Sequence, residues 1–235
     1  MKESMEQTLE AKSSELKAHF LALQAQINPH FISNILMVIS STGYELGSKK
    51  IVMICSQLSD MMKYISASDS MNITLKAELA HVNNYLELLK WRFEDQLHYE
   101  YHIDERLQSI QVPKLILQPL VENSYNHGFS GKRPPWKLTI TGWLEEDKWF
   151  IEIRDDGIGF SENSLAKIKN QISEYREKFN QGKILSEQPI GGMGLLNVYS
   201  RLFMLYRDKL VFEIHSDLKG ETSIKIGGPS GMDQS

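Results

Sequence analysis

The chain has 235 residues, of which 41% are hydrophobic and 24% are charged, a composition that argues against a disordered, collagen-like or membrane-embedded protein. The 26 Lys and Arg residues against 30 Asp and Glu give a net charge of −4, so we expect no nucleic-acid partner. The length exceeds that of the usual single domain, and we predict two domains.

The N-terminal residues have the pattern of an amphipathic helix that packs against a partner. Apolar side chains recur at spacings of three and four, at Leu9, Leu16, Phe20, Leu23 and Ile27. Pro29 cannot donate a backbone hydrogen bond, so we expect this helix to be kinked or interrupted just before His30. Residues 31–41 are apolar on most faces, which predicts a helix buried within a bundle.

Two further helical stripes follow before residue 95. The first consists of Ile51, Ile54, Leu58, Met61 and Ile65, and the second of Leu75, Leu79, Val82, Leu86, Leu89 and Phe93. Thr74 is the predicted N-cap of the second helix. One short hairpin cannot bury so much apolar surface, so residues 1–95 are predicted to form a helical region that dimerises. The single cysteine, Cys55, has no disulfide partner within the chain, which favours a reducing compartment.

From residue 98 onward the pattern changes to alternating strands and helices. Strand patterns are found at 98–103, 137–144, 149–154, 210–215 and 222–226. Helices are predicted over 113–128 and 191–206, and we expect them to pack on one face of a mixed sheet. Residues 161–188 are polar with one weak helical stripe and are predicted to form a mobile lid. The tail at 229–235 is predicted to be disordered.

Two glycine-rich clusters in this second region have the chemistry of a nucleotide site. Asp155 ends a strand and is followed by Gly157 and Gly159, so its carboxylate can accept a hydrogen bond from a ligand amine such as that of adenine. Gly192 and Gly194 precede a helix whose first N–H groups are available to a phosphate. Each cluster alone is more often a turn or a helix cap, and neither is a Walker A motif.

A third cluster lies on the first helix of this region. Glu122 and Asn123 carry oxygen ligands of the kind that Mg²⁺ prefers when it bridges phosphates. Asn123 and His127 could equally be a solvated helix face. The functional interpretation is favoured by the order of the three clusters along the chain.

This ordered set resembles the ATP-binding domain shared by the gyrase, Hsp90, histidine kinase and MutL proteins. The resemblance implies that Asn123 is the magnesium ligand, that Asp155 reads the adenine and that Thr222 lies near the base. It also implies a Bergerat-type α/β sandwich that binds ATP and Mg²⁺. The implied nucleotide contacts are Asn123, Asn126, His127, Asp155, Gly157, Gly159, Gly192, Gly194, Leu195 and Thr222. Pro119 is a departure, because many members carry a second Asn or a Glu there.

A narrower resemblance is to the LytS/YesM-type sensor histidine kinases. It rests on LQAQINPHFISN at 23–34, on LILQPLVEN at 115–123 followed by His127-Gly128, and on NNYLELLKWRF at 83–93. In that family the histidine of the Pro-His-Phe element is the phosphoacceptor, which here is His30. The pair Ile32-Ser33 departs from the bulkier Leu-Phe or Leu-Tyr pair that is common there.

The residues around His30 allow this role on chemical grounds. A neutral imidazole nitrogen is nucleophilic near neutral pH, although a lone histidine on an apolar helix is more often structural. Asn34 lies one turn away and could fix the tautomer of the imidazole by a hydrogen bond. No acidic residue follows His30 directly, so Glu122 is our candidate for the general base.

We therefore predict an α+β protein with a helical dimerisation and phosphoacceptor region at 1–95, an ATP-binding domain at 96–228 and a disordered tail at 229–235. The resemblance implies ATP-dependent autophosphorylation on His30, a homodimer, and phosphoryl transfer to an aspartate of a response regulator. It also implies an upstream sensor in the cell membrane, with this fragment on the cytoplasmic side. Two alternatives are a non-catalytic ATP-binding dimerisation scaffold and an ATP-gated clamp that does not need His30.

Overall fold

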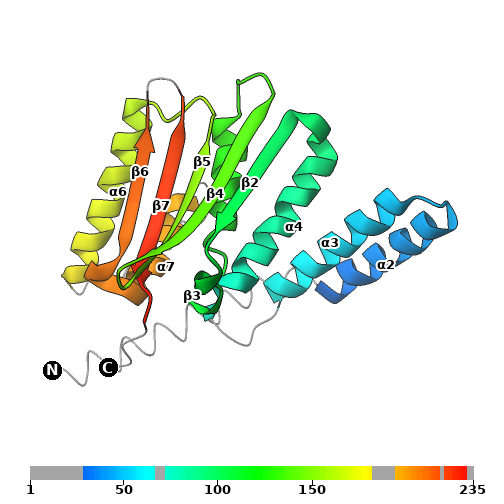
Figure 1. Cartoon of the computed structure of the whole chain (residues 1–235), viewed down its shortest axis with the longest axis horizontal. Helices are drawn as coiled ribbons and strands as arrows, with labels where there is room; N and C mark the ends of the chain where they lie inside the picture. The colour runs from blue at the N-terminus through cyan, green and yellow to red at the C-terminus, as the bar shows by residue number, and fades with distance from the viewer. Residues whose placement is uncertain (1–28, 67–71, 182–193, 218–219, 232–235) are drawn as a thin grey trace. The chain divides into compact units, whose positions relative to one another are not determined.

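The computed structural model of the protein describes residues 29–66, 72–181, 194–217 and 220–231, and it divides into two compact units (Figure 1). The units are Met1–Asp69 and Ser70–Ser235. The helix predicted for Leu9 to Ile27 lies outside the described residues, and the interruption predicted before His30 falls at their edge. Within the described ranges, no helix has both the length and the apolar character needed to cross a bilayer.

The described part of the first unit, residues 29–66, is a helical hairpin. Its helices are α2 (Pro29–Glu45) and α3 (Lys49–Ser66), joined by a turn in which Gly47 has a positive φ of 67°. A Cβ on Gly43 would lie 2.6 Å from Cγ2 of Ile51, so a glycine there lets the two helices approach closely. On α3, Met61 of the predicted stripe is buried and its other four residues are half-buried, while the buried Cys55 lies outside that stripe.

Much of the apolar surface of α2 remains exposed in the single chain. Met37 and Val38 are 69% and 67% exposed, and Phe31 is 61% exposed. Only part of the helix, including the buried Leu36, packs inward. The burial that the sequence predicts for residues 31–41 is therefore not reached within the described part of one chain.

The second unit is built on a five-stranded sheet. The strands are β2 (Leu97–Ile103), β4 (Trp136–Glu145), β5 (Lys148–Asp155), β6 (Val211–Ser216) and β7 (Thr222–Pro229), in the spatial order β2-β4-β5-β7-β6. The β2–β4 pair is parallel and the other pairs are antiparallel, so the predicted mixed sheet is confirmed. Each strand lies where alternating or β-branched residues predict it.

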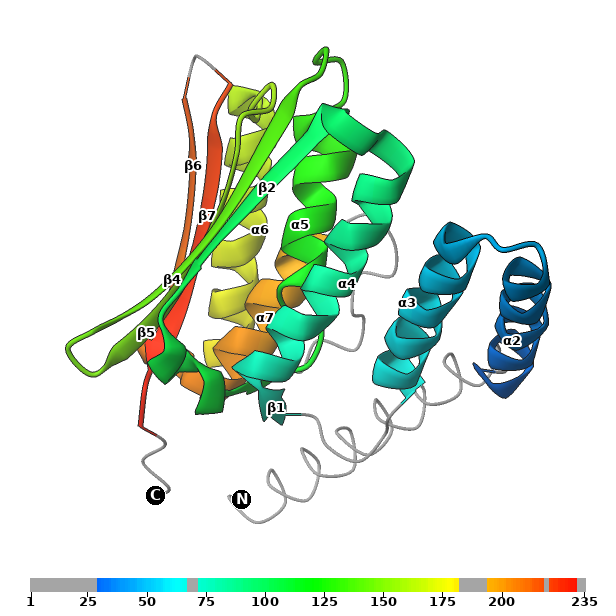
Figure 2. The same cartoon turned by 45° about the vertical axis from the view of Figure 1, so that its right-hand side comes forward.

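Helices cover one face of this sheet, as Figures 1 and 2 show. They are α4 (Leu75–Phe93), α5 (Gln118–Asn123), α6 (Glu162–Asn180) and α7 (Gly194–Tyr206), and a π-helical turn at Ser124–Gly128 follows α5. Short elements complete the unit: β1 (Asn72–Thr74) pairs with β3 (Gln111–Pro113), and single 3₁₀ turns lie at Glu94–Gln96, Glu105–Ser109 and Arg207–Lys209. The core between the layers includes Leu86, Leu120, Ile140, Ile151, Val198, Leu202 and Ile224.

Helix α4 belongs to the second unit, which differs from the boundary predicted at residue 95. Leu75, Val82 and Leu86 are buried in the same core as the sheet, and Thr74 caps the helix by accepting a 3.3 Å hydrogen bond from the N–H of Ala77. The structure divides the chain at residue 69 instead. An amphipathic stripe predicts that a helix is buried, but it does not say which partner buries it.

The helix predicted from Pro113 begins later, at Gln118, because a buried carboxylate holds the preceding residues in another conformation. Leu115 has a positive φ of 59°, which no α-helix contains. The Glu78 side chain on α4 accepts hydrogen bonds from the N–H groups of Leu115, Ile116 and Leu117, at 3.1, 2.7 and 3.3 Å. Glu78 is fully buried, so this carboxylate ties α4 to the start of α5.

The lid and tail predictions also need correction. Most of the range 161–188 forms the ordered helix α6, which Ser161 caps and which packs against α7 through the Tyr175 ring. Residues 182–188 of the predicted lid lie outside the described residues. The predicted tail begins too early, because β7 runs to Pro229 and the N–H of Ser230 donates to the carbonyl of Asp147 at 2.7 Å.

Candidate functional site

Asp155 ends β5 inside the second unit and is held there by two donors. The Ser124 hydroxyl donates to Oδ2 of Asp155 at 2.7 Å, and the backbone N–H of Gly157 donates to Oδ1 at 3.0 Å. Asp155 is only 2% exposed, and this burial raises the pKa of its carboxyl against the opposing effect of both donors. Each carboxylate oxygen keeps a further lone pair with which it can accept a hydrogen bond from a ligand.

Glycines make room for this carboxylate. A Cβ on Gly128 would lie 2.6 Å from Oδ1 of Asp155, and a Cβ on Gly157 would lie 2.3 Å from the carbonyl oxygen of Gly128. A Cβ on Gly220, whose φ is 97°, would lie 2.3 Å from the carbonyl oxygen of Gly157. Three segments far apart in the sequence therefore meet closely around Asp155. A larger residue at Gly157 or Gly220 would require a shift of the backbone, and one at Gly128 would displace the Asp155 side chain.

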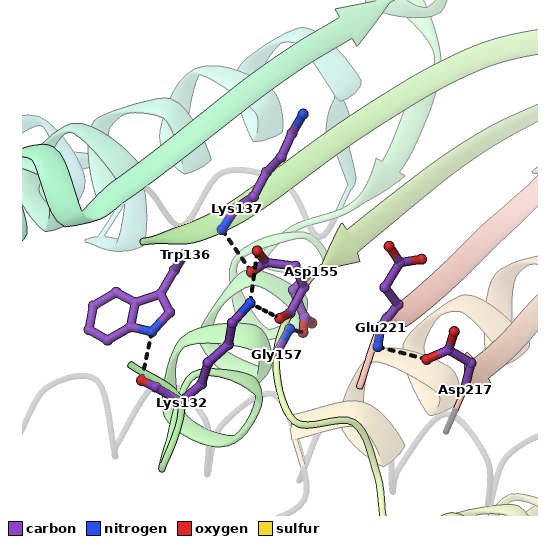
Figure 3. Close-up of polar contacts among 8 residues, drawn as sticks. Lys132, Trp136, Lys137, Asp155, Gly157, Asp217 and Glu221 are labelled. Atoms are coloured by element: carbon purple, nitrogen blue, oxygen red, sulfur yellow. Dashed lines mark hydrogen bonds and ion pairs between the residues drawn. The ribbon is translucent and has the colours of Figure 1, made fainter. Parts of the chain in front are cut away.

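The residues next to Asp155 are braced by a separate network (Figure 3). The ammonium group of Lys132 forms an ion pair with the Asp156 carboxylate at 2.8 Å and also donates to the Asp156 carbonyl. The same carboxylate accepts from the N–H of Lys137 at 2.8 Å, while the indole of Trp136 donates to the carbonyl of Lys132 at 3.0 Å. Lys132 thus fixes the turn after β5, and its charge is already paired.

A pocket brings several of the predicted nucleotide contacts together. Its lining consists of Asn123, His127, Gly128, Asp155, Gly159, Phe160 and Thr222. The β5–β7 register sets Thr222 directly opposite Asp155. A larger hollow, lined by Glu152, Arg154 and His215 among others, opens on strand residues that alternate with the buried ones, so it faces away from the helices.

Other residues that the resemblance implies as nucleotide contacts do not line this pocket. Asn126 is exposed one turn after Asn123, and Gly194 and Leu195 form the start of α7. A Cβ on Gly194 would lie 3.6 Å from Cβ of Pro119, so the first turn of α7 lies beside the first turn of α5. Gly192 lies outside the described residues.

The donor set fits a magnesium ion that is held mainly by phosphate oxygens. Among the described residues, no group of three or more His, Cys, Asp or Glu side chains could enclose a metal. Asn123 is half-buried at the pocket and supplies one amide oxygen, a ligand type that Mg²⁺ accepts. Mg²⁺ commonly binds through one or two protein ligands together with substrate phosphates and water, and Asn123 could serve as one such protein ligand.

The Glu122 side chain forms a hydrogen bond within its own helix, α5. It is half-buried, and its Oε1 accepts a 2.7 Å hydrogen bond from Nε2 of Gln118, one turn earlier on α5. Neither Gln118 nor Ser124 is distinguished as a site residue by the sequence pattern. The contact of Gln118 with Glu122 and the contact of Ser124 with Asp155 are visible only in the folded structure, where α5 and the end of β5 lie together.

Arg201 and Lys132 are two cations that could bind a phosphate, but both side chains contact other groups of the protein. Arg201 on α7 donates to the carbonyl of Lys114 at 2.8 Å. Burial lowers the pKa of its guanidinium, and the nearby Glu78 charge opposes that shift. Arg201 and the paired Lys132 therefore support the protein framework, and neither is free to bind the triphosphate.

His30 lies in the first unit, near the start of α2. Its side chain is exposed, and the predicted contact with Asn34 is present, with the amide nitrogen 3.3 Å from Nδ1 of the imidazole. An amide nitrogen is a donor, so in this arrangement Nδ1 accepts and a neutral imidazole carries its proton on Nε2. The second nitrogen therefore bears the proton and points away from Asn34.

Comparison with known proteins gives matches over both units. Residues 13–97 match the family described as histidine kinase, and residues 109–228 match the family described as histidine kinase-, DNA gyrase B-, and HSP90-like ATPase. The sensor protein LytS of Oceanobacillus iheyensis is 35% identical over 200 residues, which cover 84% of this chain and 32% of that protein. The sensor histidine kinase YesM of Bacillus subtilis is 28% identical over 229 residues, which cover 97% of this chain and 36% of that protein.

Solved structures give a fainter similarity. The histidine kinase domain from the Erythrobacter litoralis EL346 blue-light activated histidine kinase aligns with a TM-score of 0.47 and 14% identity, covering 94% of each chain. The chain spans about a third of the length of the two curated relatives that it matches.

Proposed function

Because this chain belongs to the LytS/YesM-type sensor histidine kinases, we propose that it transfers the γ-phosphoryl group of ATP to its own His30. The observation that carries the proposal is the pocket in which Asn123, Asp155 and Thr222 meet. These residues come from three separate segments of the chain, with Asp155 and Thr222 suited to the adenine and Asn123 suited to the phosphate end of ATP. The product is then a phosphohistidine that can pass its phosphoryl group onward.

The adenine end of the nucleotide is assigned to Asp155. Ser124 and Gly157 each donate to one of its oxygens, which orients the carboxylate plane before a ligand arrives. A 6-amino group can donate to a remaining lone pair of Asp155, and Thr222, which lies opposite Asp155 in the β5–β7 register, would complete the adenine site. The glycines at 128 and 157 let the surrounding backbone pack directly against the Asp155 carboxylate.

The phosphate end is assigned to Asn123 and to the start of α7. The first N–H groups of α7, at Gly194 and Leu195, have no partner within the helix and attract an anion. Asn123 would hold Mg²⁺ together with water and phosphate oxygens. The ion supplies charge neutralisation on the phosphates. His127, which also lines the pocket, is placed to donate to a phosphate oxygen.

In the transfer step, Nε2 of His30 attacks the γ-phosphorus while the bond to the bridging oxygen breaks and ADP leaves. The Asn34 contact supports an imidazole whose proton is on Nε2, so that proton must leave as the new N–P bond forms. We assign its removal to the Glu122 carboxylate. Positioning and charge neutralisation account for the rest of the rate.

The partners follow from the same proposal. The exposed apolar side chains of α2, including Phe31, Met37 and Val38, are suited to contact a second copy of the chain in a homodimer. A response regulator would take the phosphoryl group from His30 onto an aspartate. The whole protein would carry a sensor region in the cell membrane, with the ATP-binding domain in the cytoplasm.

The test is phosphoryl incorporation from γ-labelled ATP and Mg²⁺ into wild type, His30→Gln and a control, His98→Gln. His98 is an exposed histidine on β2, far in sequence from every proposed site residue. We expect acid-labile, alkali-stable label on wild type and His98→Gln and none on His30→Gln. Acid-labile label on the His30→Gln variant would show that His30 is not the phosphoacceptor. Nucleotide binding without label on any of the three proteins would indicate the non-catalytic scaffold. ATP hydrolysis at the same rate in wild type and His30→Gln would indicate the ATP-gated clamp.

A further inference from the structure

A serine at the end of β6 holds part of the segment that connects β5 to α6. The hydroxyl oxygen of Ser216 accepts a 2.9 Å hydrogen bond from the backbone N–H of Phe160. Phe160 and its neighbour Gly159 both line the nucleotide pocket, together with Asp155. Ser216 does not line this pocket, so it contacts the outside of residues 158–160, which we call the wall segment.

The strand register fixes the place of Ser216 beside the proposed adenine site. Ser216 pairs with Thr222 across β6 and β7, and Thr222 pairs with Asp155 across β7 and β5. Residues that pair directly across neighbouring strands point to the same face of a sheet. The three side chains therefore form one row, on the face that carries the Ser124 contact to Asp155.

The wall segment is held between this row and the turn that follows α5. A Cβ on Gly159, whose φ is 74°, would lie 2.6 Å from Oγ of Ser216, so a glycine allows the close approach. On the other side, the N–H of Ile158 donates to the carbonyl of Gly128 at 2.7 Å. The Gly128 anchor is a backbone group, whereas the Ser216 anchor is a side chain that substitution can remove.

On the basis of the proposed function, we infer that Ser216 is a positioning residue for the adenine base of ATP. By holding the N–H of Phe160, it fixes the spacing between the wall segment and Asp155. It acts through the wall segment and does not touch the nucleotide. Because the wall segment is ordered before ATP arrives, binding does not carry the conformational cost of ordering it.

The contact lies where its loss should change binding more than folding. The hydrogen bond to Ser216 is only partly buried, so water can replace the hydroxyl as the acceptor for Phe160. The β6–β7 ladder consists of backbone hydrogen bonds and keeps its register without the Ser216 side chain. What is lost is the fixed direction of the Phe160 N–H, and with it the position of the wall segment.

The first experiment compares the binding of ATP and ITP to the full 235-residue chain by calorimetry. ITP has the same phosphates but a 6-oxo group in place of the 6-amino group, so this group cannot donate to Asp155 and the affinity depends on the phosphate end. We expect Ser216→Ala to raise the dissociation constant for ATP about three- to tenfold, while that for ITP changes less than about twofold. Equal losses for both nucleotides, or an unchanged constant for ATP, would overturn the inference.

The matched control is Ser223→Ala on the opposite face of the sheet. Ser223 follows Thr222 on β7, so its side chain points away from the adenine site. We expect this variant to bind both nucleotides as wild type does. Urea unfolding without nucleotide should give midpoints close to wild type for Ser223→Ala and for Ser216→Ala.

A second pair of variants isolates the hydroxyl even if Ser216→Ala folds poorly. Ser216→Thr and Ser216→Val have nearly the same shape, and only threonine keeps the acceptor. Ser216→Val should bind ATP about three- to tenfold more weakly than Ser216→Thr, and equal binding by the two would overturn the inference.

The wild-type chain separates this inference from the proposed function. A wild-type chain that binds ATP and ITP equally well would remove the adenine assignment, and Ser216 would lose its role with it. A wild-type preference for ATP that Ser216→Ala leaves unchanged would remove only the role of Ser216.

Discussion

The hydroxyl of Ser124 donates a 2.7 Å hydrogen bond to Oδ2 of Asp155, and this contact joins the end of α5 to the end of β5. Both side chains are buried, so the bond has no solvent competitor. Ser124→Ala should lower the stability of the second unit by about 1–3 kcal/mol, because a buried carboxylate loses one of its two donors. The free energy of unfolding in urea measures this loss.

The same substitution should weaken ATP binding, because the carboxylate plane is no longer fixed before the adenine arrives. We expect the dissociation constant to rise about three- to tenfold, measured by calorimetry. Ser200→Ala is the control, since that buried hydroxyl donates to the carbonyl of Asn197 within α7 and does not contact Asp155 in any hydrogen bond that the structure describes. An unchanged dissociation constant for Ser124→Ala would show that Gly157 alone orients Asp155.

The raised pKa of Asp155 predicts a particular dependence of stability on pH. Between the ordinary aspartate value of about 3.9 and the raised folded value, the folded state binds more protons than the unfolded state, so this residue makes stability fall as pH rises. Asp155→Asn removes the titration, so its stability relative to wild type should increase from pH 3.5 upward until the folded carboxyl is ionised.

An aspartate with the opposite shift provides the comparison. The guanidinium and the N–H of Arg106 lower the pKa of the Asp104 carboxyl to about 2, so its contribution is present above about pH 4 and is lost as pH falls. Asp104→Asn should therefore lose stability relative to wild type as pH rises. Urea unfolding across this range should give slopes of opposite sign for the two variants, and equal slopes would contradict the assignment.

Gly157 should tolerate no side chain. A Cβ there would lie 2.3 Å from the carbonyl oxygen of Gly128 and 2.6 Å from Oδ1 of Asp155, distances at which backbone must move. We expect Gly157→Ala to cost at least about 1–3 kcal/mol of stability and to weaken ATP binding. Gly231→Ala is the matched control, because a Cβ at that position would meet no atom within 4 Å. Thermal unfolding of both variants, with and without ATP, tests the comparison.

The sequence predicts the fold well where local pattern and burial agree. The strand patterns and the apolar stripes of α3 and α4 are read correctly, since each depends only on the spacing of side chains along its own element. The gathering of Asn123, Asp155 and Thr222 in one pocket is what the family resemblance of their motifs implies. The sequence does not predict that α4 packs in the second unit, because the apolar stripe of a helix does not identify the element that buries it.

Long-range polar contacts are what the sequence cannot supply. Glu78 accepts from N–H groups 37 to 39 residues away, and this contact delays the start of α5 and gives Leu115 a left-handed backbone. His81 has no metal-ligand or catalytic spacing, and its bond to Gln118 also spans 37 residues. Such contacts depend on the packed arrangement of α4 against α5, which no local pattern encodes.

Glu78 should therefore be one of the most sensitive positions for stability. Glu78→Leu leaves three backbone donors without their acceptor, two of them in a buried segment, and should cost about 3–5 kcal/mol. Glu78→Gln keeps one acceptor oxygen and should cost less. Glu105→Gln, at an exposed acid, should remain close to wild type. Urea unfolding monitored by tryptophan fluorescence gives the ranking, and a neutral Glu78→Leu would show that the turn at 115–117 is held by other contacts.

The contact between Asn34 and His30 predicts which imidazole nitrogen carries the proton. The amide nitrogen donates to Nδ1 at 3.3 Å, which favours the tautomer protonated on Nε2 and makes transfer depend on a base. Asn34→Asp replaces the donor with an acceptor and should favour a proton on Nδ1, which the ¹⁵N shifts of His30 would report. Because Nε2 then already presents its lone pair, Glu122→Gln should slow phosphorylation less in the Asn34→Asp background than in wild type. Thr42→Ala, which removes a hydroxyl bonded to Val38 on the same helix, should leave that dependence unchanged. An equal effect of Glu122→Gln in both backgrounds would contradict the assigned tautomer.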